Sequence, residues 1–263
     1  MMLSKWEYFE ISCTEYLNRE FGNCANFEHK GGPNSTIPDI KVTTKSGNIF
    51  YIEVKHSPAQ CGQFVLHPDI TSNTFIYSHS NITPINTYAL QIINYMNDHF
   101  NEFINAGTAG KDIIMDTEIF SNWIISNYKN KDVRYFITNN YTIVPIEKIN
   151  EYFYVSAKYR VKRSGSKSVG KNNISDVMEY IHSSSYDIKN MRTENRKLFV
   201  VSTDSLHNLR FRINDCEYMF SLRDSEYEVR RLSNTFNANV IFLIDLKPNK
   251  NGIRSEEFKK ALE

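Results

Sequence analysis

The chain has 263 residues, of which 41% are hydrophobic and 13% aromatic, a composition that excludes a disordered protein and allows a substantial core. Its formal net charge of +1 excludes a strong overall attraction to nucleic acid, so any DNA-binding surface must come from local segregation of charge. The cysteines at positions 13, 24, 61 and 216 have neither the spacing of a zinc site nor that of a disulfide framework. We recognise no signal segment and no apolar run of membrane length. These features predict a cytoplasmic, soluble protein with no membrane association.

The N-terminal segment has the pattern of an amphipathic helix. Ser4 and Glu7 have the spacing of a capping box, and apolar residues follow at helical spacing from Trp6 to Phe21. Glu10 lies at the edge of the apolar face. Its carboxylate is either solvated or directed toward a metal ion as an outer acid, and both interpretations stay open.

Two short strands are predicted next, at residues 39–43 and 48–55, after a first strand at 26–30. Both are rich in β-branched and aromatic side chains. The link between them, residues 45–47, ends in Gly, which takes positive φ without a steric penalty and therefore favours a tight hairpin.

The hairpin register brings two acids together. A turn centred on residue 46 pairs Val42 with Phe50 and Asp39 with Glu53, whose Cβ atoms are then about 5 Å apart. Two like charges in this position repel each other, so a divalent cation between them is expected. Mg²⁺ prefers carboxylate oxygens and keeps waters that a phosphate can replace.

Period-2 alternation places Lys55 on the same face as Glu53. There its ammonium can hold a phosphate oxygen and orient an attacking water. The hairpin therefore predicts Mg²⁺-assisted hydrolysis of a phosphodiester, with Asp39 and Glu53 binding the metal and Lys55 catalytic. Val54 and Glu10 are further candidate metal-binding residues.

The triplet Asp/Glu-x-Lys alone is a weak signal. Only Glu53 combines it with a strand, a preceding Pro-Asp and a suitable register, and the alternative is a surface strand with an ordinary Glu–Lys ion pair. The strongest competitor, Asp245-Leu246-Lys247, ends the apolar run 240–244 but lacks a partner acid at hairpin distance. The other triplets begin at Glu28, Asp187 and Glu257.

The segment that follows, residues 57–63, is polar at both ends. Gln63 is a candidate catalytic residue that can hydrogen-bond a metal-bound water or a DNA phosphate, and the alternative is ordinary turn or cap chemistry. His56 and His67 lack a third ligand and do not make a zinc site.

The remaining elements indicate two parts. Thr83-Pro84 has the order expected at a helix start. We expect a catalytic domain at 1–130 and a DNA-recognition part at 131–263, with 183–232 as an accessory DNA-contacting subdomain. Helices are predicted at 83–103, 118–128, 176–182 and 255–262, a short helix or turn at 146–152, and a polar loop at 183–195. Strands are predicted at 133–138, 141–145, 154–161, 197–202, 209–213, 217–222, 227–232 and 240–244.

Residues 158–171 contain six basic side chains and no acid. Such a composition, interleaved with Ser and Gly, suits contact with phosphates and reading of guanine in the major groove. The alternative is a solvated basic loop. The predicted DNA-binding residues are Lys158, Arg160, Lys162, Arg163, Ser164, Gly165, Ser166, Lys167, Asn234 and Asn237.

Pro38-Asp39 followed by Glu53-Val54-Lys55, on a hairpin after an N-terminal helix, resembles the PD-(D/E)XK nuclease superfamily. Five blocks in the same order across nearly the whole chain resemble a type II restriction endonuclease, although residues 183–231 match no block. The blocks are residues 9–18, 50–55, 60–66, 159–166 and 232–242.

The resemblance implies an α/β (mixed α+β) fold with a mixed β-sheet flanked by helices and a C-terminal β-rich recognition part. It also implies a Mg²⁺-dependent enzyme that cuts double-stranded DNA at a short palindrome, with GCGC as the expected site. Such an enzyme is paired with a cognate DNA methyltransferase and is expected to act as a monomer. The alternatives are a repair or structure-specific nuclease of the same superfamily and a DNA-binding module without catalysis.

Overall fold

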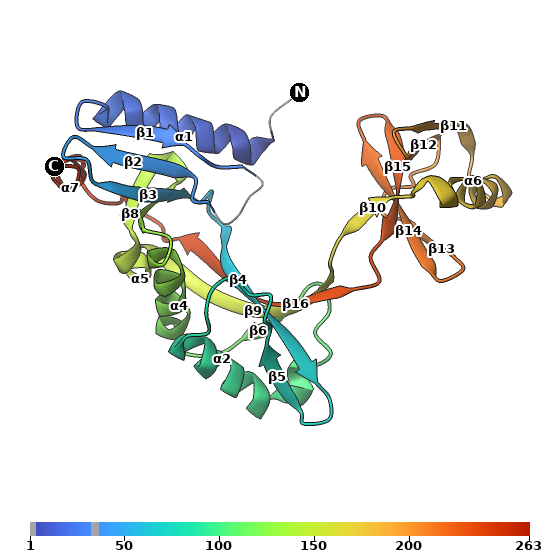
Figure 1. Cartoon of the computed structure of the whole chain (residues 1–263), viewed down its shortest axis with the longest axis horizontal. Helices are drawn as coiled ribbons and strands as arrows, with labels where there is room; N and C mark the ends of the chain where they lie inside the picture. The colour runs from blue at the N-terminus through green and yellow to red at the C-terminus, as the bar shows by residue number, and fades with distance from the viewer. Residues whose placement is uncertain (1–3, 33–36) are drawn as a thin grey trace. The chain divides into compact units, whose positions relative to one another are not determined.

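The computed structural model describes residues 4–32 and 37–263. Their contacts divide the chain into two compact units, one built from the residues up to 160 together with 238–263, the other from 161–237 (Figure 1). No division between compact units falls at the boundary expected near residue 130, because strand β7 (Val133–Thr138) pairs with β3 (Ile49–Val54) in one sheet.

The first sheet carries the hairpin. Adjacent strands are antiparallel except β3 and β7, which are parallel, and this confirms the expected mixed sheet. On β2 and β3 every second side chain is buried, so the alternation in the sequence gives one core-facing side and one open side. The strand order is β1 (Ala25–His29), β2 (Ile40–Thr44), β3, β7 and β8 (Thr142–Pro145).

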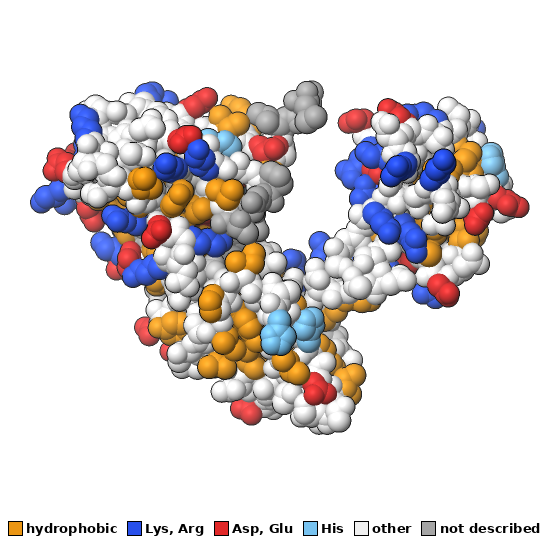
Figure 2. Space-filling view, viewed as in Figure 1, with side chains coloured by type: hydrophobic (Ala, Val, Ile, Leu, Met, Phe, Trp, Pro, Cys, Tyr) orange, Lys and Arg blue, Asp and Glu red, His pale blue; other side chains and the backbone are white. Residues whose placement is uncertain are grey.

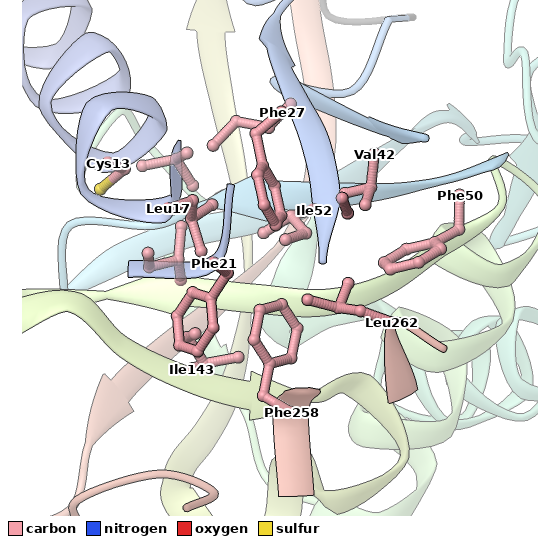
Figure 3. Close-up of a cluster of buried hydrophobic side chains, with 14 residues drawn as sticks. Cys13, Leu17, Phe21, Phe27, Val42, Phe50, Ile52, Ile143, Phe258 and Leu262 are labelled. Carbon is pink, nitrogen blue, oxygen red and sulfur yellow. The ribbon is translucent and has the colours of Figure 1, made fainter. Parts of the chain in front are cut away.

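Helices α1 (Lys5–Phe21) and α7 (Ser255–Ala261) pack on the buried side of this sheet (Figure 3). The predicted capping box of α1 is present, since the Ser4 hydroxyl accepts from the Glu7 amide and the Glu7 carboxylate accepts from the Ser4 amide. Burial of each large apolar side chain contributes about 1.5–3 kcal/mol, so this core fixes α1 against the hairpin. Its members include Cys13, Leu17, Phe21, Phe27, Val42, Phe50, Ile52, Ile143, Phe258 and Leu262.

Helix α4 (Thr117–Lys129) joins the first sheet to a second one. Trp123 stacks on Phe242 of the second sheet with a centroid distance of 4.1 Å, and Tyr128 meets Phe136 of β7 with a centroid distance of 5.1 Å. The second sheet has the order β5 (Thr74–Tyr77), β4 (Ala59–Asp69), β16 (Phe236–Leu246), β9 (Phe153–Arg163) and β6 (Lys111–Ile113).

The helix predicted from Thr83 begins later and is interrupted. Helix α2 (Thr87–Asp98) starts at Thr87 because the side chain of Asn86 caps it, accepting from the Ala89 amide, and a break at His99 separates it from α3 (Phe100–Phe103). Thr83 instead donates to the side chain of Asn127 at 2.7 Å. The short elements are η1 (Asn139–Tyr141), η2 (Ile146–Lys148), α5 (Ile149–Tyr152) and η3 (Lys171–Asn173).

The unit formed by residues 161–237 is a sheet with one helix, α6 (Ile174–Ser183). The prediction of a loop at 183–195 is wrong, because β11 (Ile188–Glu194) pairs along its length with the next strand. Its side chains are mostly exposed, so no alternation marked it. The strand order is β11, β12 (Lys197–Ser202), β15 (Glu226–Leu232), β14 (Cys216–Arg223) and β13 (Arg210–Ile213), and β10 (Ser166–Ser168) also pairs with β15.

None of the helices formed by residues 4–32 and 37–263 is long and apolar enough to cross a membrane. All four cysteines are free thiols.

Candidate active site

The hairpin has the register that the sequence predicts. Val42 pairs with Phe50 and Ile40 with Ile52, so the next pair along the strands is Asp39 and Glu53. The turn is closed by the Gly47 amide, which donates to the Thr44 carbonyl at 3.0 Å. Gly47 has φ +86°, which explains why glycine ends this link.

Asp39 is held in place and is costly to ionise. Its Oδ2 accepts a 2.8 Å hydrogen bond from the Val54 amide. Burial, followed by the charge of Glu53, raises the pKa of Asp39 to about 7. The two acids therefore do repel each other, as the register predicts.

Lys55 partly relieves this repulsion. Its Nζ donates to Glu53 Oε1 at 2.7 Å, and both side chains are largely buried, with exposed fractions of 16% and 13%. Burial favours the neutral amine, but the charges of Glu53 and Asp39 outweigh it and raise the pKa of Lys55 above its usual value. The ammonium is thus charged and points into the site instead of into bulk solvent, so an exposed surface pair does not describe it.

Tyr128 is a site residue that the sequence did not indicate. Its hydroxyl donates to Glu53 Oε1 at 3.3 Å, and its ring lies 5.8 Å from Lys55 Nζ. The buried thiol of Cys61 is also close, and burial raises its pKa to about 12, so it stays protonated. Tyr128 lies on α4, which is remote in sequence from the hairpin, and no local motif marked it, whereas Cys61 lies on β4, the strand that follows the hairpin.

Glu10 is buried instead of solvated. Its Oε2 lies 3.1 Å from His29 Nε2 on β1. Burial is the main cause that raises the pKa of Glu10, and the charges of Glu53 and Lys55 also act on it. Glu10 therefore belongs to the electrostatic environment of the hairpin acids.

The oxygen donors of the site suit a hard cation. Within residues 4–32 and 37–263, no three His, Cys, Asp or Glu side chains converge into a ready-made metal site. Two neighbouring buried carboxylates, one of them with a raised pKa, nevertheless give the donor set and the excess negative charge that Mg²⁺ requires. The side chain of Val54 is buried and apolar, so only its main chain is available to a metal.

A hollow of about 570 Å³ lies elsewhere in this unit, lined by residues that include Tyr16, Asn140, Asp245 and Lys247. None of the hairpin acids lines it. Asp245 accepts a hydrogen bond from the Ser57 hydroxyl at 3.0 Å, and Lys247 donates to the Asn150 carbonyl. The competing Asp-x-Lys triplet therefore makes structural contacts.

Gln63 lies in strand β4, not in a turn. Its Oε1 accepts from Gln60 Nε2 at 3.0 Å, and Gln60 Oε1 accepts from Arg160 Nη2 at 3.3 Å. The structure thus joins one predicted catalytic residue to a predicted DNA-binding arginine through Gln60, which the sequence did not single out. The side chains of Gln60 and Gln63 are exposed, so both amides are accessible to a ligand.

The predicted basic loop is divided between the two units at residue 160. Lys158 pairs with Asp112 at 3.4 Å. Arg163 is engaged inside its own unit, because it pairs with Glu217, donates to the Ser233 carbonyl at 3.2 Å and lies over the ring of Phe236. Arg163 therefore has a structural role whatever else it contacts.

Residues 164–167 and 231–234 line a surface hollow of about 410 Å³ within the unit 161–237. Ser164 is tied to Ser233 and Thr235 by its hydroxyl, while Arg230 donates to the Ser166 carbonyl at 2.7 Å. Asn234 and Asn237 are exposed. Figure 2 shows several Lys and Arg side chains on this unit. Within the unit, Arg192 pairs with Glu226 at 2.7 Å and Arg230 pairs with Glu228 at 2.8 Å.

The pKa of Asp39 gives a prediction about stability. A folded-state pKa near 7 lies above the usual pKa of an aspartate. Ionisation of the folded Asp39 therefore lowers stability as pH rises from about 4, and the loss is complete above pH 7. Asp39→Asn keeps an oxygen for the Val54 amide but removes the charge. We expect it to raise the free energy of unfolding by on the order of 2 kcal/mol at pH 8 and to have little effect near pH 4. Urea denaturation at both pH values measures this, and an equal effect at the two would contradict it.

The chain is similar to one solved structure over almost its full length. HhaI endonuclease in complex with DNA shares 38% sequence identity with it, over 98% of this chain and 99% of that chain, with a TM-score of 0.79. No family model matches the chain, and no curated protein matches it.

Proposed function

Because the chain belongs to the family of HhaI-like restriction endonucleases, we propose that it cuts duplex DNA at a short palindromic site, with GCGC as the expected sequence, in a Mg²⁺-dependent reaction. It is a site-specific endonuclease of type II. The observation that carries the proposal is the similarity to an endonuclease solved with DNA, because it spans both compact units. The hairpin acids supply the chemistry for the PD-(D/E)XK type of site.

In this proposal Asp39 and Glu53 hold the metal with their carboxylates, the Val54 main chain provides a further oxygen, and Glu10 acts as an outer acid. Mg²⁺ bound there would neutralise developing charge and lower the pKa of a bound water. The Val54 amide fixes Asp39 by a 2.8 Å hydrogen bond. These contacts preorganise the acids before substrate arrives.

Lys55 has the catalytic role of holding a nonbridging phosphate oxygen and orienting the attacking water. Its ammonium lies 2.7 Å from Glu53 Oε1, which keeps the charge beside the metal-binding oxygen. Tyr128 donates to the same oxygen and limits the orientations that the carboxylate can take. Gln63 is proposed as a catalytic residue beside Asp39, Glu53 and Lys55. Through Gln60 it is connected to Arg160, a proposed DNA-binding residue.

DNA contact is proposed for both units. In the first, Lys158 and Arg160 are the contacting residues, and in the second they are Lys162, Arg163, Ser164, Gly165, Ser166, Lys167, Asn234 and Asn237. The catalytic role is assigned to the unit that carries the hairpin, and the recognition role to the unit 161–237, which contains the expected accessory segment 183–232. We further propose that the enzyme acts as a monomer and that a cognate DNA methyltransferase protects the host.

Digestion of unmethylated plasmid tests the proposal. With Mg²⁺ we expect discrete fragments whose sequenced ends share one palindrome, and with EDTA we expect intact plasmid. A smear, or preferred cutting at ends and flaps, would favour a repair or structure-specific nuclease. Binding without any cutting would favour a DNA-binding module. Treatment of the plasmid with a GCGC-specific methyltransferase should abolish cutting if GCGC is the site.

A further inference from the structure

The end of strand β1 contacts the buried acid Glu10, which interacts electrostatically with the hairpin acids. His29 is the last residue of β1. Its Nε2 lies 3.1 Å from Glu10 Oε2, and the Glu10 side chain is only 12% exposed. His29 therefore reaches an acid that lies on α1, nineteen positions earlier in the chain. A hydrogen bond of this kind fixes which way a carboxylate faces.

Gly31 provides the space for that carboxylate. A Cβ atom at this position would lie 2.2 Å from Glu10 Oε2 and 2.9 Å from His29 Nε2. Any larger residue must displace the Glu10 carboxylate, because it is the end of a flexible side chain and yields more easily than backbone. The glycine is thus required by the side chain that packs on it.

The same segment is tied to the predicted metal-binding acid. The Lys30 and Gly31 amides both donate to the Asp39 carbonyl, at 2.7 Å and 3.0 Å. The main chain next to His29 is therefore hydrogen-bonded to the main chain of the residue that would bind metal.

The charges of the site explain why such positioning matters. Glu10, Asp39 and Glu53 interact electrostatically, and Lys55 is the permanent cation that acts on both Glu10 and Asp39. With all three acids ionised, three negative charges face one ammonium. Glu10 therefore adds to the negative charge that a cation at the Asp39–Glu53 pair would neutralise, and its contribution depends on where its carboxylate lies.

We propose that His29 and Gly31 are positioning residues that hold the Glu10 carboxylate in place to support cation binding at the Asp39–Glu53 pair. This inference rests on the proposed function and extends it to residues outside the proposed metal-binding and DNA-binding sets. His29 acts through its hydrogen bond, and Gly31 acts through the absence of a side chain.

Mn²⁺ binding to the whole protein without DNA, measured by calorimetry, tests the inference. His29→Ala and Gly31→Ala should weaken Mn²⁺ binding about ten-fold, within the range that loss of an outer hydrogen bond to a metal ligand produces. Both should raise the Mg²⁺ concentration for half-maximal cleavage while leaving KM for DNA unchanged. His29→Gln, whose amide can donate from a similar position, should recover much of the loss.

Gly107→Ala is the matched control, since a Cβ atom there meets open space, and it should bind Mn²⁺ as the wild type does. Thermal unfolding of each variant identifies any general loss of fold, and if His29→Ala does not fold, Gly31→Ala decides. Wild-type Mn²⁺ affinity in Gly31→Ala and in folded His29→Ala would overturn the inference while leaving the proposed function intact. A wild-type protein that neither binds Mn²⁺ nor cleaves DNA would overturn both.

Discussion

Lys55→Ala and Asp39→Ala are each expected to reduce cleavage of the target plasmid by roughly 10²–10³-fold or more, the range for loss of one preorganised charge-stabilising group. Asp39 supplies one of the two carboxylates proposed to hold Mg²⁺, and Lys55 supplies the positive charge beside them. Single-turnover nicking rates at saturating Mg²⁺ measure the effect. Loss of the chemical step should appear in the rate, with binding of target DNA largely preserved.

The chain provides a control for this prediction in the competing triplet. Lys247→Ala removes a lysine that follows a strand in the same way, but whose ammonium donates to the Asn150 carbonyl. It should cleave at nearly the wild-type rate. Equal cutting by wild type, Asp39→Ala and Lys55→Ala would show that the site has been wrongly assigned, and loss of cutting in Lys247→Ala alone would move it to the other triplet.

The hairpin could be predicted from sequence because all of its determinants are local. Gly47 fixes the turn, the alternation of apolar side chains fixes the buried face, and together they leave one register for Asp39 and Glu53. The capping box of α1 is local in the same sense. Elements with such short-range determinants were predicted to within a few residues.

The surroundings of the hairpin depend on contacts that no local pattern encodes. Tyr128 reaches Glu53 only because β3 pairs in parallel with β7 and α4 packs beside it. Glu10 was left between two interpretations because its partner, His29, lies on another element. The division into units was also beyond local reasoning, since the chain leaves the first unit at residue 160 and returns at 238.

The basic side chains of residues 158–171 also depend on contacts that the local sequence does not encode. Its composition predicted a DNA-binding loop, but composition does not distinguish a free arginine from a paired one. Arg163 pairs with Glu217. Arg160 contacts only the neutral side chain of Gln60 through Nη2, and its Nε is buried without a hydrogen-bond partner in the described structure.

Arg160→Ala is therefore expected to lower the preference for target over non-target DNA by about 1–3 kcal/mol, or roughly 5- to 150-fold. An uncommitted guanidinium next to exposed glutamines can offer donors to a base or a phosphate, and its removal leaves no buried acid unpaired. Competition binding and cleavage with target and single-mismatch duplexes measure the preference. Thermal unfolding should change little.

Arg163→Ala is the matched comparison and should have the opposite profile. Its loss leaves the partly buried Glu217 carboxylate with only a more distant arginine, Arg210, at 3.7 Å, and removes the contact over Phe236. We therefore expect reduced stability, by about 1–3 kcal/mol, with a smaller effect on discrimination between target and mismatched sites. If Arg163→Ala relaxed specificity while Arg160→Ala did not, base reading would have to be assigned to the second unit, with Arg163 exchanging Glu217 for DNA on binding.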